Sequence, residues 1–138
     1  MMTFVLSCMY SSYAQKDVDP KDMIGFGCYS GGMITKSVYD FTSLLEKSKY
    51  QNFLKFLDSK SKSEKFLAAV VCKKLNKDRK LKLSAIEIKK IDTILNSDEL
   101  VSICSGCTYF SKISFKELSK KNKENFMLDK IEDWLAKY

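Results

Sequence analysis

The chain has 138 residues, of which 45% are apolar and 30% are charged, and it contains 24 basic residues, 17 acidic residues and no histidine. This length suits one domain, and the apolar fraction excludes a disordered chain. Because histidine is absent, Ser-His-Asp catalysis, Cys-His catalysis and His-ligated metals are excluded. No nucleotide-binding motif takes their place, so we expect no catalytic residue, no metal site and no cofactor.

The N-terminal residues 1–10 form a short apolar run, and the first charged residue is Lys16. A bilayer-spanning helix needs about 20 apolar residues, so this run is too short for a transmembrane segment. Signal peptidase requires small side chains one and three positions before the bond that it cleaves. Ala14 and Ser12 meet this requirement and predict cleavage before Gln15. We therefore interpret residues 1–14 as a signal peptide and the protein as exported, either periplasmic or secreted. The alternatives are an apolar element of the mature fold and lipid attachment at Cys8.

Residues 15–36 are predicted to be a polar and glycine-rich leader. The stretch from Gly25 to Gly32 contains four of the five glycines of the chain, which is too many for a stable helix interior. A phosphate-binding loop is excluded because no Gly-Lys-Ser/Thr follows. We expect a loop here, with Cys28 fixing it to the rest of the protein.

Residues 37–138 are predicted to form a single α-helical domain. The spacing of Val38, Phe41 and Leu45 predicts a helix over 37–47, and the pattern repeats over 50–57. Three capping boxes then mark helix starts; they are Ser61 with Glu64, Ser84 with Glu87, and Ser114 with Glu117. The helix that contains residues 66–72 is apolar on almost every side and should be central, whereas residues 100–104 could be helix or strand. A last amphipathic helix is expected over 126–138.

The sequence thus predicts an all-α fold, either an irregular bundle or a short stack of about five to six helices. Residues 66–71, which follow a polar turn, resemble the second helix of a HEAT-like repeat, and residues 91–104 echo residues 53–72. Together with the glycine-rich stretch, this is similar to small exported bacterial proteins of unassigned function. The resemblance implies stacked helical hairpins, and it does not suggest any particular activity.

Four cysteines follow the predicted cleavage point: Cys28, Cys72, Cys104 and Cys107. In an oxidising compartment this even number permits two disulfides, with three connectivities that the sequence leaves open. Cys104 and Cys107 also form a C-x-x-C motif, which is typical of redox sites and of half a zinc site. The helical flanks disfavour the redox interpretation, and the isolated positions of Cys28 and Cys72 disfavour zinc.

The positive charge consists of lysine with a single arginine, Arg79, and it is densest over residues 73–82 and 116–123. Nucleic-acid-binding proteins favour arginine interleaved with aromatic residues, whereas the basic residues here are almost all lysine. We therefore expect no nucleic-acid partner. A solvated surface, or contact with an anionic envelope surface, fits better. The partner-binding candidates are basic or aromatic residues, namely Lys77, Arg79, Lys80, Lys82, Tyr109 and Phe110.

We therefore expect an exported, non-enzymatic protein that binds a protein partner, for instance an immunity-type inhibitor of an envelope toxin or enzyme. The alternative function is a thiol–disulfide redox protein that uses Cys104 and Cys107.

Overall fold

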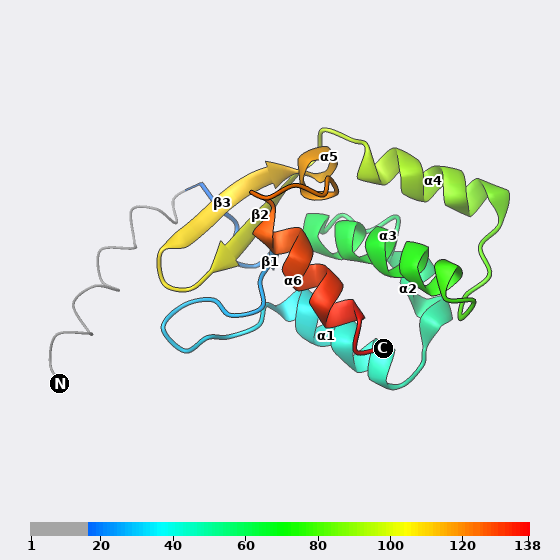
Figure 1. Cartoon of the computed structure of the whole chain (residues 1–138), viewed down its shortest axis with the longest axis horizontal. Coiled ribbons are helices and arrows are strands. Elements are labelled where there is room, and N and C mark those ends of the chain that lie inside the picture. Colours follow the sequence, from blue (N-terminus) through cyan, green and yellow to red (C-terminus); the bar gives the residue numbers. More distant parts are fainter. Residues whose placement is uncertain (1–16) are drawn as a thin grey trace, which may run out of the picture.

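The fold is mixed α/β, and the computed structural model describes residues 17–138. Figure 1 shows the elements, which are β1 (Met23–Ile24), α1 (Lys36–Glu46), the 3₁₀ turn η2 (Tyr50–Asn52), α2 (Phe53–Phe56), α3 (Lys62–Lys77), α4 (Ala85–Leu95), β2 (Leu100–Ser105), β3 (Tyr109–Ser114), α5 (Phe115–Leu118) and α6 (Phe126–Leu135). The all-α prediction is wrong, because three strands form a sheet beside the helices. The predicted signal peptide lies outside the described residues.

The sheet has the order β1-β2-β3, with β1 parallel and β3 antiparallel to β2. Four successive residues of β2, from Val101 to Cys104, are buried. Because both faces of this strand are covered, it lacks the alternation of apolar and polar residues that identifies a strand in a sequence. Residues 91–104 are consequently a helix followed by a strand, so the expected second helical hairpin is wrong. The segment predicted to be a leader contributes β1 to the sheet.

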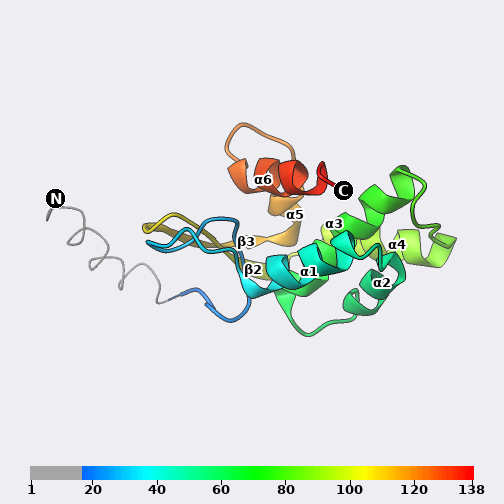
Figure 2. The same cartoon turned by 90° about the horizontal axis from the view of Figure 1, so that it is seen from below.

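The helices begin near the positions that the sequence predicts, and α3 is the central one. Phe66, Leu67, Ala68 and Ala69 are fully buried in the main core. Helices α1, α2 and α4 and strand β2 all pack against α3. In Figure 2, α2 and α6 lie on opposite sides of this helix.

The N-terminus of α3 is held by a residue that is distant in sequence. Ser61 accepts a hydrogen bond from the Glu64 backbone NH, but the Glu64 carboxylate accepts from Ser59 instead of closing a capping box. Asp22 completes the cap: its carboxylate accepts from the Ser61 and Ser63 hydroxyls at 2.7 and 2.6 Å and from the backbone NH groups of residues 62 and 63. Asp22 therefore ties the segment before β1 to α3.

The environment of Asp22 favours its charged form. Burial alone would raise the pKa of this carboxyl, but the hydrogen bonds from Ser63 and Ser61 and from the backbone outweigh burial and lower the pKa below its ordinary value. The folded state thus gains stability from ionised Asp22 at pH values above the unfolded pKa of about 3.9.

Replacing Asp22 should destabilise the fold in a pH-dependent way. We expect Asp22→Ala to lower the free energy of unfolding at pH 7 by about 2 kcal/mol, because a charged cap and its hydrogen bonds are lost. As the pH falls below about 4 and through the lowered pKa, wild type loses the same contribution, so the difference should shrink. Urea unfolding between pH 7 and pH 2 measures this, with the exposed Asp98→Ala as control. A constant difference would contradict the assigned role.

Candidate functional site

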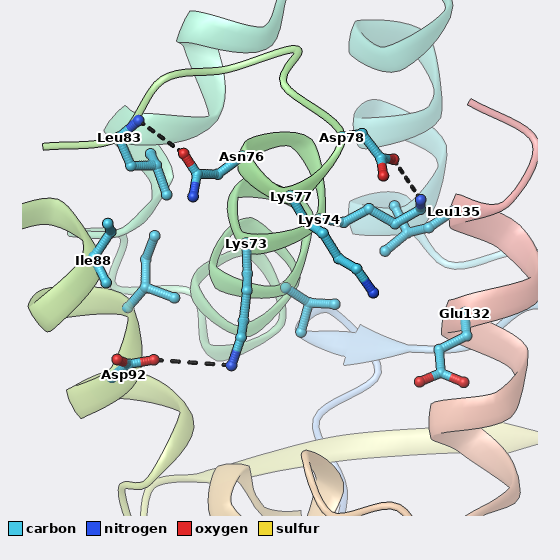
Figure 3. Close-up of a pocket in the computed structure, with 12 residues that line it drawn as sticks. Lys73, Lys74, Asn76, Lys77, Asp78, Leu83, Ile88, Asp92, Glu132 and Leu135 are labelled. Atoms are coloured by element: carbon cyan, nitrogen blue, oxygen red, sulfur yellow. Dashed lines mark hydrogen bonds and ion pairs between the residues drawn. The ribbon is translucent and has the colours of Figure 1, made fainter.

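A groove lies between α3, α4 and α6, with a volume of about 700 Å³ (Figure 3). Its apolar lining comes from three helices and the α3–α4 connection and comprises Val70, Leu83, Ile88, Ile91 and Leu135. Seven polar or charged residues complete the lining, so the groove combines an apolar part with groups that can bind a charged partner.

One face of α3 forms the floor of the groove. Val70, Lys73, Lys74 and Lys77 have the i, i+3, i+4, i+7 spacing of a single helix face. In Figure 3, α4 and α6 stand on either side of this face: Lys73 extends toward Asp92 on α4, and Glu132 faces α3 from α6. The face is left open because the two flanking helices pack beside it.

A second depression of about 390 Å³ continues the groove toward α5. Val70, Lys73, Asp92 and Glu132 line both parts, so the two depressions share their walls. The continuation adds lysines from α5 and from the loop that leads to α6. We call the combined depression the α3–α4–α6 groove.

The α3–α4–α6 groove has a surplus of positive charge. It is lined by six lysines (Lys73, Lys74, Lys77, Lys116, Lys120 and Lys121) and by three carboxylates (Asp78, Asp92 and Glu132). The two lysine-rich stretches of the sequence, 73–82 and 116–123, therefore meet at one site.

The ion pairs of the groove leave some of this charge free. Lys74 lies 2.5 Å from Asp78, Lys73 lies 3.9 Å from Asp92, and Lys121 pairs with Glu132, which raises the pKa of Lys121. Lys77 and Lys116 have no ion pair with any residue in 17–138. Exposed ion pairs of this type are worth at most about 1 kcal/mol each, so an anionic ligand can compete for these lysines.

Of the predicted partner-binding residues, only Lys77 lines the groove. Arg79 lies just after α3 with a positive φ of 60°, and Lys80 donates a hydrogen bond to the carbonyl of Tyr138. Lys82 is exposed in the connection to α4. The remaining two candidates, Tyr109 and Phe110, belong to β3 and lie apart from the groove.

Sequence reasoning missed the other groove residues, although one signal was present. The i, i+3, i+4, i+7 pattern that begins at Val70 combines one apolar residue with three lysines, which resembles an ordinary solvent-exposed face. Only the positions of α4 and α6 turn this face into a floor.

The structure pairs Cys28 with Cys104 in a disulfide, so one bridge forms among the four candidate cysteines. Cys72 is buried in α3 as a free thiol, and burial, with a smaller effect from Glu87, raises its pKa to about 12. Cys107 is a partly exposed thiol in the β2–β3 turn. The C-x-x-C motif therefore spans a hairpin turn and contains no internal disulfide.

The disulfide lies directly against Gly25. A Cβ atom at this position would be 2.1 Å from Sγ of Cys28, 2.3 Å from Sγ of Cys104 and 3.0 Å from the Cys104 carbonyl oxygen. Such distances are far below van der Waals contact, so only glycine allows the bridge and β1 to pack together.

Adding a methyl group at Gly25 should therefore disrupt the bridge. We expect Gly25→Ala to lower the free energy of unfolding by about 3 kcal/mol through overpacking. Gly27→Ala is the matched control, because a Cβ there meets nothing within 4 Å. Thermal unfolding of the two variants measures the difference, and equal stabilities would contradict the packing argument.

Alkylation of the native protein should distinguish the cysteines. We expect Cys107 to react with iodoacetamide, Cys72 to react only after unfolding, and Cys28 and Cys104 only after reduction. Peptide mass spectrometry before and after each step reads the four sites separately. A disulfide between Cys104 and Cys107 would instead support the redox alternative.

Comparison with known protein families, curated proteins and solved structures finds no match for this chain. Within residues 17–138, no helix combines the length and the apolar character needed to cross a membrane. In the same part of the chain, no group of three or more Cys, Asp or Glu residues could hold a metal ion together.

Proposed function

We propose that this is an exported, non-enzymatic binding protein that holds an acidic amphipathic helix of a partner protein in the α3–α4–α6 groove. The observation that carries the proposal is the combination of an apolar part of the lining with a surplus of three positive charges. Export rests on the signal-like residues 1–14 of the sequence.

The apolar part of the groove suits a helix. An amphipathic helix binds in a groove by placing its residues at i, i+3 or i+4, and i+7 against the apolar part of the lining. Here the partner helix, which we call the guest, would lie along the open face of α3. Val70 and Ile91 would lie beneath it, and Ile88 and Leu135 at its sides. Helices pack with their axes 8–10 Å apart, so such a guest would fill the space between α4 and α6 as part of their layer.

The lysines select the sign of the charge on the guest. Lys77 on α3 and Lys116 on α5 lie at different parts of the groove, and neither has an ion-pair partner in residues 17–138. Lysine presents a mobile point charge on a flexible stem, which tolerates carboxylates in many positions better than it specifies one geometry. A helix with Asp and Glu flanking its apolar stripe is complementary to this pattern.

An immunity-type role is one form of this function. A protein that covers an acidic, amphipathic segment of a toxin or an enzyme in the envelope would block it without performing chemistry. Redox exchange between Cys104 and Cys107 would require the bond between Cys28 and Cys104 to be broken first.

The test uses a labelled helical peptide of leucine and glutamate with all its leucines on one face, titrated by fluorescence anisotropy. We expect binding that weakens as salt is added, and weaker binding by a peptide of the same composition with the leucines scattered around the helix. The double variant Lys77→Glu/Lys116→Glu should reduce the affinity about tenfold or more, or ~1.4 kcal/mol.

A matched control separates the groove from the overall charge. Lys55→Glu/Lys60→Glu changes the net charge equally at exposed positions in and after α2, outside the groove, and should leave the affinity within about twofold. Equal weakening by both double variants would reduce the binding to general attraction between opposite charges. Displacement of the peptide by oleate at the same affinity would assign the groove to a small anionic amphiphile instead.

A further inference from the structure

Two segments that lack charge meet at one end of the protein. Residues 23–35 and 100–111 contain no charged side chain, although 30% of the chain is charged. The loop after β1 and the β2–β3 turn project side by side beyond the helices in Figures 1 and 2. We call residues 25–34 and 105–110 the tip.

The tip exposes large apolar and aromatic side chains. Met33 is 63% exposed, Ile34 and Tyr109 are each 42% exposed, and Tyr29 is 36% exposed. Half of the exposed large hydrophobic residues in the described part of the chain thus lie at this end. A concentration of this kind on a charged protein marks an interaction surface.

The conformation of the tip favours display of Tyr29. This residue has a φ of 63°, in the left-handed region where glycine is favoured, and its ring packs on Phe110 at a centroid distance of 5.4 Å. Gly32 and Gly106 in the tip also have positive φ, so Tyr29 is the residue with a side chain among these three turn positions. A strained aromatic residue at an exposed turn is a feature expected of a contact site.

Several backbone hydrogen bonds join the two segments of the tip. Cys28 and Met33 exchange two hydrogen bonds of 2.8 Å across the loop, Tyr29 donates to the carbonyl of Gly106, and Gly106 donates to the carbonyl of Gly27. The Cys28–Cys104 disulfide fixes the same loop to β2. These bonds satisfy part of the backbone of the tip within the protein, which lowers the cost of moving that part out of water.

The acidic groups nearest in sequence to the tip are already paired. Asp22, before the first segment, caps α3, and Glu99, before the second, lies within 3 Å of Lys62 and Lys65. Lys112, after the second segment, is exposed and has no ion pair with any residue in 17–138. The net charge of +7 on the whole chain favours approach to an anionic surface, and the acidic groups before the two segments do not oppose it with a free charge.

We propose that the tip inserts into the headgroup region of an anionic lipid bilayer, with Tyr29, Met33, Ile34 and Tyr109 as the inserted side chains. Tyrosine is favoured at membrane interfaces because one end of its ring is apolar and the other is polar. The tip projects from the body, is uncharged and is fixed to β2 by a disulfide, which suits contact with a flat lipid surface. This inference is independent of the proposed function of the groove.

The test is co-sedimentation of the full-length, disulfide-intact protein with two kinds of vesicle. One contains phosphatidylcholine alone, and the other contains equal amounts of phosphatidylcholine and phosphatidylglycerol. We expect binding to the anionic vesicles, and a reduction of about tenfold for Met33→Asp. Ile86→Asp is the matched control, because Ile86 is 82% exposed on α4, away from the tip. This variant should bind the vesicles like wild type. The apolar run at residues 1–10 is the same in every variant, so differences report on the tip.

A second readout locates the inserted residues. Brominated lipids should quench the fluorescence of Met33→Trp and leave that of Ile86→Trp unchanged relative to wild type, whose only tryptophan is Trp134. Equal sedimentation of wild type and Met33→Asp, or equal quenching of the two tryptophan variants, would overturn the proposal. Self-association that Met33→Asp abolishes, without vesicle binding, would also overturn it and assign the tip to a second copy of the chain.

Discussion

The disulfide between Cys28 and Cys104 is the constraint on which the position of β1 and of its flanking residues depends. Strand β1 has only two residues, and a strand of that length pairs too weakly to hold a long segment in place. The bridge closes a loop with a sequence separation of 76, which in the chain-entropy account is worth about 4 kcal/mol. It positions the tip, keeps Gly25 in its close packing, and holds the N-terminal segment where Asp22 can reach α3.

Helix α3 links this frame to the groove. Its N-terminus is fixed by Asp22, its apolar face, which includes Phe66 and Leu67, is fully buried, and its open face supplies Val70 and Lys77 to the groove. The floor of the groove is therefore part of the most constrained element of the protein. A guest helix would meet a preformed surface and lose little binding energy to ordering the host. The flanking helices α4 and α6 set the width of the groove.

The sequence predicts the helices well because their signals are local. The Ser84–Glu87 capping box and the apolar stripe of α4 lie within a few residues of one another, and the structure has both. The strands are different, because β2 is buried on both faces and β1 is defined only by its pairing with residues 102 and 103. The disulfide connectivity and the union of two lysine-rich stretches at the groove likewise depend on contacts between distant segments. Such contacts leave no periodic pattern in the sequence. Of the lysines that line the groove, the sequence therefore names Lys77 as a candidate and does not name Lys116.

The placement of charge separates the two proposed surfaces. Lysines line the groove, whereas residues 23–35 and 100–111 carry no charge, and Figure 1 shows the tip at the opposite end of the molecule from α4. A protein that contacted an anionic bilayer through its lysines would have fewer lysines left for an acidic partner. Attachment through uncharged side chains such as Met33 leaves the groove lysines available. In the two proposals together, the tip holds the protein at the membrane, while the groove, which α4 borders, keeps its lysines for an acidic helix.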